Sequence, residues 1–141
     1  MRLRALADAP YAFGSTWEHE RVNTEKQWRN AIESRARFVA NLDGAILGMA
    51  AAGDSGDPRA ASLTSLWVDH RARGTGLGDS LVLAAVAWAI DAGYEQLILW
   101  VTDGNTHAQK LYERHGFVRT GSVQQVRPGE DSLEFEMALS L

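Results

Sequence analysis

The hydrophobic pattern begins with helical segments. Residues 2–8 carry apolar side chains three positions apart, and Pro10 stops helix propagation soon afterwards. Residues 15–18 have the capping-box spacing, which predicts a polar helical segment that starts there. A second segment, capped by Asn23 or Thr24, follows. Its predicted apolar face consists of Trp28, Ala31 and Ile32.

Three extended segments come next. Residues 37–42 and 45–52 flank Asp43-Gly44, a dipeptide typical of two-residue hairpin turns because both positions tolerate positive φ. Residues 53–59 are rich in Gly, Asp, Ser and Pro and predict a loop, after which residues 60–68 resume an extended run. The pattern predicts a meander of three antiparallel strands.

Helices and strands then alternate. Apolar residues recur at helical spacing from Leu77 to Trp88, and Gly93 is placed to end this helix. The helix is apolar nearly all round, so we expect it to be deeply packed. Residues 97–101 form a continuous apolar run typical of a strand covered on both faces, and we expect it to pair parallel to residues 60–68.

The last third predicts one more helix and a closing hairpin. Residues 105–115 have a helical apolar face and end at Gly116. Residues 117–123 and 133–139 predict an antiparallel pair around a loop that contains Pro128-Gly129. The order is therefore helices, three strands, helix, strand, helix and two strands, and we expect residues 1–141 to form one domain.

Composition narrows the function classes. The formal charge of −4 argues against an electrostatic nucleic-acid surface, which needs an excess of Lys and Arg. The chain has no cysteine, which excludes a disulfide framework, a thiolate metal site and a cysteine nucleophile, and no other metal-ligand spacing is present. The longest apolar stretch, residues 81–90, is about half the length that spans a bilayer. We expect a cytoplasmic protein without a nucleic-acid or membrane partner.

The candidate chemistry lies in residues 71–78, Arg-Ala-Arg-Gly-Thr-Gly-Leu-Gly, between a predicted strand and a predicted helix. Glycines let a ligand approach the backbone, and the first N–H groups of a helix attract negative charge, so a diphosphate fits this position. A Walker loop needs Lys and then Ser or Thr after its last glycine, whereas Asp79 follows Gly78 here. Asp79 also stands where the dinucleotide fingerprint needs glycine. The sequence therefore argues against a nucleotide triphosphatase and against an NAD-binding loop. The alternative interpretation of residues 71–78, a glycine-rich turn that only connects the strand to the helix, is not excluded.

Arg71, Gly74 and Gly76 resemble the acetyl-CoA motif Arg-x-x-Gly-x-Gly of the GNAT N-acetyltransferases. Residues 65–69, Asn105 and the Leu-Tyr-Glu-Arg-His-Gly-Phe run at 111–117 are similar to the family's pattern in order and spacing. The resemblance covers residues 2–140. It implies an α+β fold with a central mixed, mostly antiparallel sheet, helices on both faces, and a parallel pair of strands, the family's fourth and fifth, that splay apart.

The same resemblance implies acetyl-CoA as cosubstrate, without a metal. The splayed strands are residues 60–68 and 96–101, and the pantetheine arm would enter between them. The backbone amides of residues 73–78 would hold the diphosphate. The residues expected to contact acetyl-CoA are Leu66, Trp67, Val68, Arg71, Arg73, Gly74, Thr75, Gly76, Leu77, Gly78 and Asn105.

The start of the chain departs from the family. GNAT proteins normally have a strand before the first helix, whereas this sequence begins inside that helix. We therefore expect the first strand to be missing, through truncation or a late start. One edge of the sheet would then lose its neighbour, and a homodimer is one expected assembly.

The resemblance also suggests how acetyl transfer would proceed. Tyr112 matches the family's tyrosine that protonates the leaving sulfur, and a strand amide in residues 66–68 would donate to the oxyanion. Alternatively, Tyr112 is a core residue that completes a helical stripe. The sequence does not identify the general base, and a chain of water molecules that carries the proton to solvent is one candidate. The residues that qualify by chemistry alone are Glu18, His19, Glu20, His107 and His115.

The sequence thus predicts an N-acetyltransferase that passes the acetyl group of acetyl-CoA to a primary amine directly, in a ternary complex, because no cysteine is present to carry an acyl intermediate. The acceptor is a small-molecule amine or a protein amino group. Residues 11–35 and 124–132 would choose it, and neither identifies it. The alternative function is a non-catalytic acyl-CoA-binding or partner-binding domain with the same fold.

Overall fold

The computed structural model describes residues 2–8, 16–27 and 35–141. Short helices come first, and strands and longer helices follow. In chain order the elements are α1 (Arg2–Asp8), α2 (Trp17–Glu20), β1 (Ala36–Leu42), β2 (Ala45–Asp54), β3 (Ala60–Val68), the 3-10 turn η2 (His70–Ala72), α4 (Leu77–Asp91), β4 (Gln96–Thr102), α5 (Thr106–Arg114), β5 (Val118–Gln125) and β6 (Leu133–Ser140).

The strands form one six-stranded sheet in the order β1-β2-β3-β4-β6-β5. Every neighbouring pair is antiparallel except β3 and β4, which run parallel. The expected mixed, mostly antiparallel sheet is confirmed. In the described part of the chain, β1 and β5 are its edge strands.

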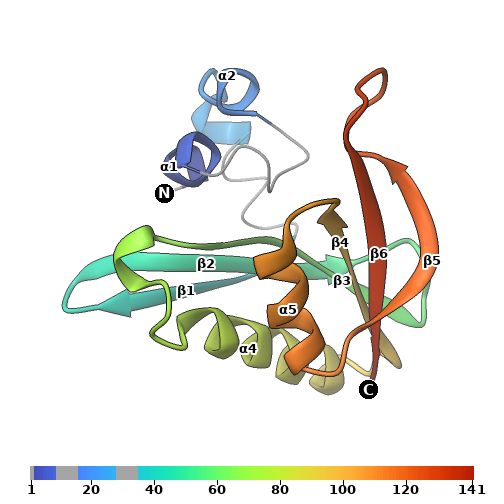
Figure 1. Cartoon of the computed structure of the whole chain (residues 1–141). Coiled ribbons are helices and arrows are strands. Elements are labelled where there is room, and N and C mark those ends of the chain that lie inside the picture. The colour runs from blue at the N-terminus through green and yellow to red at the C-terminus, as the bar shows by residue number, and fades with distance from the viewer. Residues whose placement is uncertain (1, 9–15, 28–34) are drawn as a thin grey trace.

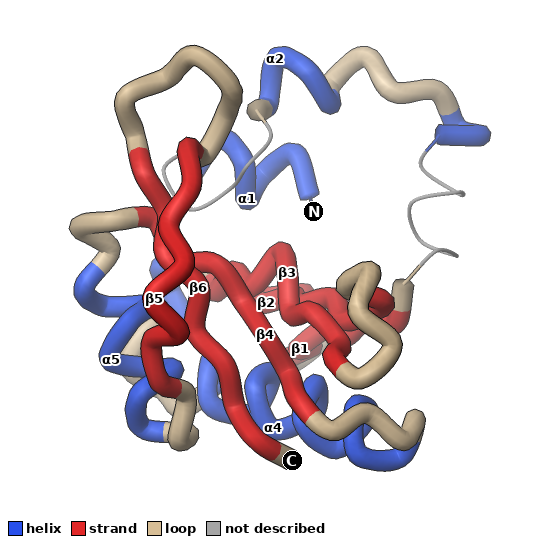
Figure 2. Tube along the Cα trace, turned by 90° about the vertical axis from the view of Figure 1, so that its right-hand side faces the viewer, coloured by secondary structure: helices blue, strands red, loops and turns tan. Residues whose placement is uncertain are grey.

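Helices cover both faces of this sheet. Figure 1 shows α4 and α5 on one side and α1 and α2 on the other, and Figure 2 shows the same layers from the side. The larger core lies between the sheet and α4 and α5, where Leu97, Leu99, Phe117 and Met137 are almost completely buried. A smaller core on the opposite face joins Ala5 and Leu6 of α1 to strand residues Met49 and Trp67.

The parallel pair separates soon after it begins. Only Ala60, Ala61 and Ser62 of β3 pair with β4, although β3 continues to Val68 and β4 to Thr102. β4 keeps its pairing with β6 along its whole length. The expected splayed pair is therefore confirmed, and the six β3 residues after Ser62 face the opening without a β4 partner.

Arg35 marks the point where the two strands part. Its Nη2 donates to the carbonyl oxygen of Ser62 at 3.0 Å and to its hydroxyl at 2.5 Å. The side chain crosses β2 over Gly53, where an added Cβ would lie 3.2 Å from Arg35 Cγ. Gly53 therefore gives Arg35 room to reach β3.

The predicted turns and caps are largely confirmed. Asp43 and Gly44 both adopt positive φ, as the hairpin requires. Thr24 caps the helical residues 25–27 through reciprocal bonds with Gln27, so Thr24 rather than Asn23 is the cap. The predicted apolar face at Trp28, Ala31 and Ile32 lies outside the described residues.

The expectation that α4 is deeply packed was wrong for its outer side. Leu81, Val82, Ala85 and Ala89 are buried against the sheet, whereas Leu83 and Ile90 are 56% and 55% exposed. One layer of helix covers one face of a sheet, so the far side of α4 faces outward despite its apolar residues.

In the part of the chain that the structure describes, no helix combines the length and the apolar character needed to cross a membrane.

Two leucines of α4 test this orientation. We expect Leu81→Ala to lower the free energy of unfolding by about 2–5 kcal/mol, because it leaves a cavity in the core, and Leu83→Ala to lower it by less than about 1 kcal/mol. Denaturant unfolding of both variants measures the difference. Equal losses would contradict the orientation of α4.

Candidate functional site

A cavity of about 590 Å³ opens at the carboxyl end of β3. Three segments border it: the end of β3, the glycine-rich connection to α4, and α5. Its lining residues are Leu66, Trp67, Val68, Ala72, Arg73, Gly74, Gly76, Leu77, Gly78, Asp79, Asn105, His107, Ala108, Leu111 and Arg114.

The glycine-rich connection shapes the entry to α4. Gly76 precedes the helix with a φ of +87°, a conformation that other residues rarely adopt, and no side chain caps the helix. An α-helix leaves its first N–H groups without intrahelical partners. Gly78 lets α5 come close, because an added Cβ would lie 3.3 Å from Leu111 Cδ2. The arrangement presents backbone donors and the positive end of the helix dipole to the cavity.

Most of the residues predicted to contact a cosubstrate lie together on this cavity. They are Leu66, Trp67, Val68, Arg73, Gly74, Gly76, Leu77, Gly78 and Asn105. Arg71 and Thr75 are not among the lining residues. The Thr75 hydroxyl turns back to the carbonyl of Ala72, and the Arg71 side chain is bound to Asp69.

Arg71 and Arg73 point to different surroundings. The spacing Arg-x-x-Gly-x-Gly fits the chain twice, from Arg71 to Gly76 and from Arg73 to Gly78. Only Arg73 lines the cavity. The second frame therefore agrees better with the geometry, and it was overlooked because the sequence alone does not distinguish the two.

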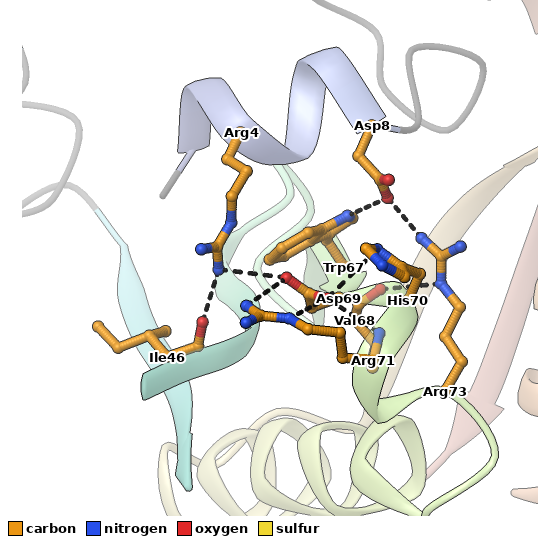
Figure 3. Close-up of polar contacts among 9 residues, drawn as sticks. All are labelled: Arg4, Asp8, Ile46, Trp67, Val68, Asp69, His70, Arg71 and Arg73. Atoms are coloured by element: carbon orange, nitrogen blue, oxygen red, sulfur yellow. Dashed lines mark hydrogen bonds and ion pairs between the residues drawn. The ribbon is translucent and has the colours of Figure 1, made fainter. Parts of the chain in front are cut away.

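Arg73 is held in place by two acceptors, as Figure 3 shows. Its Nε donates to the carbonyl of Val68 at 3.0 Å, and its Nη2 donates to Asp8 at 2.5 Å. Asp8 also accepts from the indole N–H of Trp67 at 2.9 Å. The Trp67 bond and the neighbouring Arg73 guanidinium lower the pKa of Asp8. Residues 59 to 65 positions apart thus tie α1 to the edge of the cavity.

Asp69 forms the second tie to α1 (Figure 3). The side chain is only 5% exposed and accepts from Arg71 Nε and Nη2, both at 3.0 Å, and from the Arg71 backbone N–H at 2.9 Å. Arg4 Nη2 lies 3.6 Å from the same carboxylate. The Arg71 side chain above all, and then the Arg71 backbone N–H, hold the pKa of Asp69 well below its usual range. The exposed Arg71 side chain is therefore bound to a buried carboxylate.

Asn105 joins the cavity to α5. It stands at the N-cap of the helix, and its Oδ1 accepts from the Ala108 backbone N–H at 3.3 Å. That bond fixes the side chain at the cavity wall and leaves its amide NH₂ as a donor.

Tyr112 follows the cavity-lining residue Leu111 on α5. It is 8% exposed, belongs to the larger core, and packs edge-on against Phe117 with ring centroids 5.8 Å apart. Burial raises the pKa of its hydroxyl. Tyr112 is not among the lining residues, although Ala108 and Leu111 of the same helix are.

The structure separates the candidate bases. His107 lines the cavity, whereas Glu18 is exposed and is not among the described lining residues. Glu20 is paired with Arg2, whose Nη1 also donates to Ser65 of β3 at 3.1 Å. The His19 side chain lies outside the description.

The sequence analysis missed a charged cluster at the start of α4. Asp79, in the first turn of α4, lies 2.7 Å from His115 Nε2 and accepts from Arg114 Nη2 at 3.1 and 3.3 Å. These contacts, that of His115 first, lower the pKa of Asp79. Asp79 had been considered only as a mismatch to phosphate-loop motifs, and its partners are 35 and 36 residues away in the chain.

Comparison with known proteins gives a family. Residues 2–117 match the model of the acetyltransferase (GNAT) family. A mycothiol acetyltransferase of Thermobispora bispora is 32% identical over 124 residues, which are 84% of this chain and 41% of that protein. Human N-acetylaspartate synthetase is 34% identical over 93 residues, 65% of this chain and 31% of that protein. The chain thus spans about two fifths or less of the length of these relatives.

Solved structures share the architecture. A ribosomal-protein-alanine N-acetyltransferase from Brucella melitensis superimposes with a TM-score of 0.78 at 26% identity, covering 99% of this chain and 91% of that one. A GNAT acetyltransferase from Elizabethkingia anophelis, solved with acetyl-CoA bound, has a TM-score of 0.70 at 16% identity, with 84% of each chain covered. The second likeness concerns the fold alone.

The buried Asp69 carboxylate predicts a pH-dependent effect of Asp69→Asn. A carboxylate whose pKa is lower in the folded state adds stability above its unfolded pKa of about 3.9, and loses it as the pH falls toward the folded pKa. We therefore expect the variant to unfold at lower denaturant concentration at pH 7, and the gap from the wild type to shrink below about pH 4.

Denaturant unfolding between pH 7 and pH 2.5 measures this gap, with Asp91→Asn at the exposed end of α4 as a control for the loss of one negative charge. A gap that stays constant throughout the acid range would show that the Asp69 carboxylate does not act through its charge.

Proposed function

The chain belongs to the acetyltransferase (GNAT) family, and from this premise we propose that it transfers the acetyl group of acetyl-CoA to a primary amine. The observation that carries the proposal is the cavity where β3 parts from β4, because it combines an unpaired strand edge with the N-terminus of α4. A long cosubstrate with an amide-containing arm and a diphosphate matches both features.

In this proposal the cosubstrate completes the sheet. The pantetheine arm hydrogen-bonds to the backbone of Leu66 to Val68, in place of the missing β4 partner. The diphosphate lies on the amides of residues 73–78, where the dipole of α4 favours negative charge. Arg73 adds positive charge at the cavity wall, and the Asn105 side chain donates to the arm.

The reaction itself needs few groups. The amine nitrogen bonds to the thioester carbon, the carbon–sulfur bond breaks, the nitrogen loses a proton and the sulfur gains one. We assign the donor for sulfur to Tyr112, because burial keeps its hydroxyl protonated and it lies on the helix that borders the cavity. A backbone N–H of residues 66–68 stabilises the oxyanion. Transfer is direct, since the chain has no cysteine.

The acceptor is a small-molecule amine or a protein amino group. The similar proteins include a mycothiol acetyltransferase, an N-acetylaspartate synthetase and a ribosomal-protein-alanine N-acetyltransferase, whose names refer to three different acetylated groups. The family therefore supports acetyl transfer without selecting among acceptors.

Calorimetric titration with acetyl-CoA, followed by a thiol-release assay against small amines and amino-terminal peptides, tests the proposal. Micromolar binding with thiol release supports an enzyme. Binding without transfer to any amine favours the alternative, a non-catalytic acyl-CoA-binding domain. Absence of binding overturns both.

Gly76 tests the diphosphate position. Gly76→Asp places a carboxylate at the N-terminus of α4, and we expect it to abolish acetyl-CoA binding in the same titration by repelling the diphosphate. Gly93→Asp is a matched control, because Gly93 has nearly the same φ, +86° against +87°, beyond the opposite end of α4. Unchanged affinity of Gly76→Asp, or an equal loss in Gly93→Asp, would refute the assignment.

Tyr112 tests the proton donor. We expect Tyr112→Phe to lower kcat about 100-fold while the acetyl-CoA affinity stays within about twofold, because the hydroxyl acts only in the transition state. Steady-state kinetics and calorimetry measure the two quantities. Wild-type turnover in this variant would leave Tyr112 with packing alone.

A further inference from the structure

The cavity lining includes a charged pair beside the N-terminus of α4. Arg114, the last residue of α5, binds Asp79 in the first turn of α4, and both residues line the cavity. Neither the sequence motif nor the matched family description gives Arg114 a role.

In the proposed function the groups of acetyl-CoA follow one another along this cavity. The thioester and its arm would lie at β3, and the diphosphate at residues 73–78. The next group in the cosubstrate is a ribose that carries a 3′-phosphate and adenine. A second anionic site is therefore expected close to the diphosphate, and Arg114 lies there because it binds Asp79 in the first turn of α4.

Arg114 has the donors that such a site requires. Its Nη2 binds the Asp79 carboxylate, and in the described part of the chain its Nε and Nη1 have no hydrogen-bond partner. The side chain is 57% exposed, so these donors can reach a ligand. A planar guanidinium can hold a carboxylate on one side and a phosphate on the other, which a point charge cannot do with fixed geometry.

Asp79 would oppose a phosphate if it stood alone. Its carboxylate is instead shared between Arg114 and His115. The pair of donors compensates this negative charge in the first turn of α4 and holds the Arg114 side chain at the cavity wall.

Resting on the proposed function, we infer that Arg114 binds the 3′-phosphate of acetyl-CoA and thereby selects it over 3′-dephospho-acetyl-CoA. Arg114 is a specificity-determining residue in this account. Its contribution falls on the ratio of the two affinities, which a purely structural role would leave unchanged.

The test is a calorimetric comparison of acetyl-CoA with 3′-dephospho-acetyl-CoA at one fixed ionic strength, because salt screens these contacts. We expect the wild-type protein to bind the dephospho form about tenfold more weakly, the size of one charge-assisted contact. Arg114→Gln should bind both forms with equal affinity. Arg114→Lys should keep part of the preference, since it keeps the charge.

Lys110→Gln is the matched control. Lys110 lies one turn earlier on α5, carries the same charge, is exposed, and is not among the lining residues. It should retain the full preference, which separates a local contact from a general loss of positive charge. Unfolding curves of all three variants verify that they are folded.

Two results would overturn the inference while leaving the proposed function intact: equal binding of both forms by the wild-type protein, or an undiminished preference in Arg114→Gln. If the wild-type protein binds neither form, the proposed function fails, and the inference fails with it.

Discussion

The parting of β3 and β4 is the constraint on which the rest of the structure depends. Backbone donors and acceptors inside a sheet need partners, and β3 loses those of β4 after Ser62. Arginine side chains donate hydrogen bonds to the β3 backbone at both ends of the stretch that lacks a β4 partner. Arg35 donates to the carbonyl oxygen of Ser62, and Arg73 donates to that of Val68. Between them lies an edge of the kind that accepts an added strand, and a ligand with peptide-like groups can take that place.

The helix α1 makes the wall of this opening dependent on distant contacts. Leu6 packs beside Trp67 in the smaller core, and Asp8 links the indole of Trp67 to the guanidinium of Arg73. The Asp69 carboxylate pairs with Arg71 and, at a longer distance, with Arg4. Two carboxylates therefore position the first helix and the segment that leads into α4. A single carboxylate likewise joins two elements at Asp79, whose partners Arg114 and His115 come from the end of α5.

Local signals in the sequence were sufficient for most of the fold. The Asp43-Gly44 turn, the glycines that follow α4 and α5, and the apolar periodicity of the strands predicted every strand to within a few residues, because each depends on neighbouring positions. The exposed side of α4 was missed because apolar composition does not reveal how many layers cover a helix.

The cavity-lining residues followed from a motif, but the choice between Arg71 and Arg73, and the Asp8 and Asp79 contacts, depend on residues brought together only by folding. The single-domain organisation, the cytoplasmic location and the dimer stay predictions.

The central claim is that acetyl-CoA fills the opening beside β3 and rests on the N-terminus of α4. An NMR titration of the amide-labelled protein with acetyl-CoA tests it most directly, because it reports on the backbone groups that would bind. The account predicts that the largest amide shift changes fall in residues 66–68 and 73–78 and that β1, at the far edge of the sheet, is unaffected. Changes confined to other elements, or saturation without any change in residues 73–78, would contradict it.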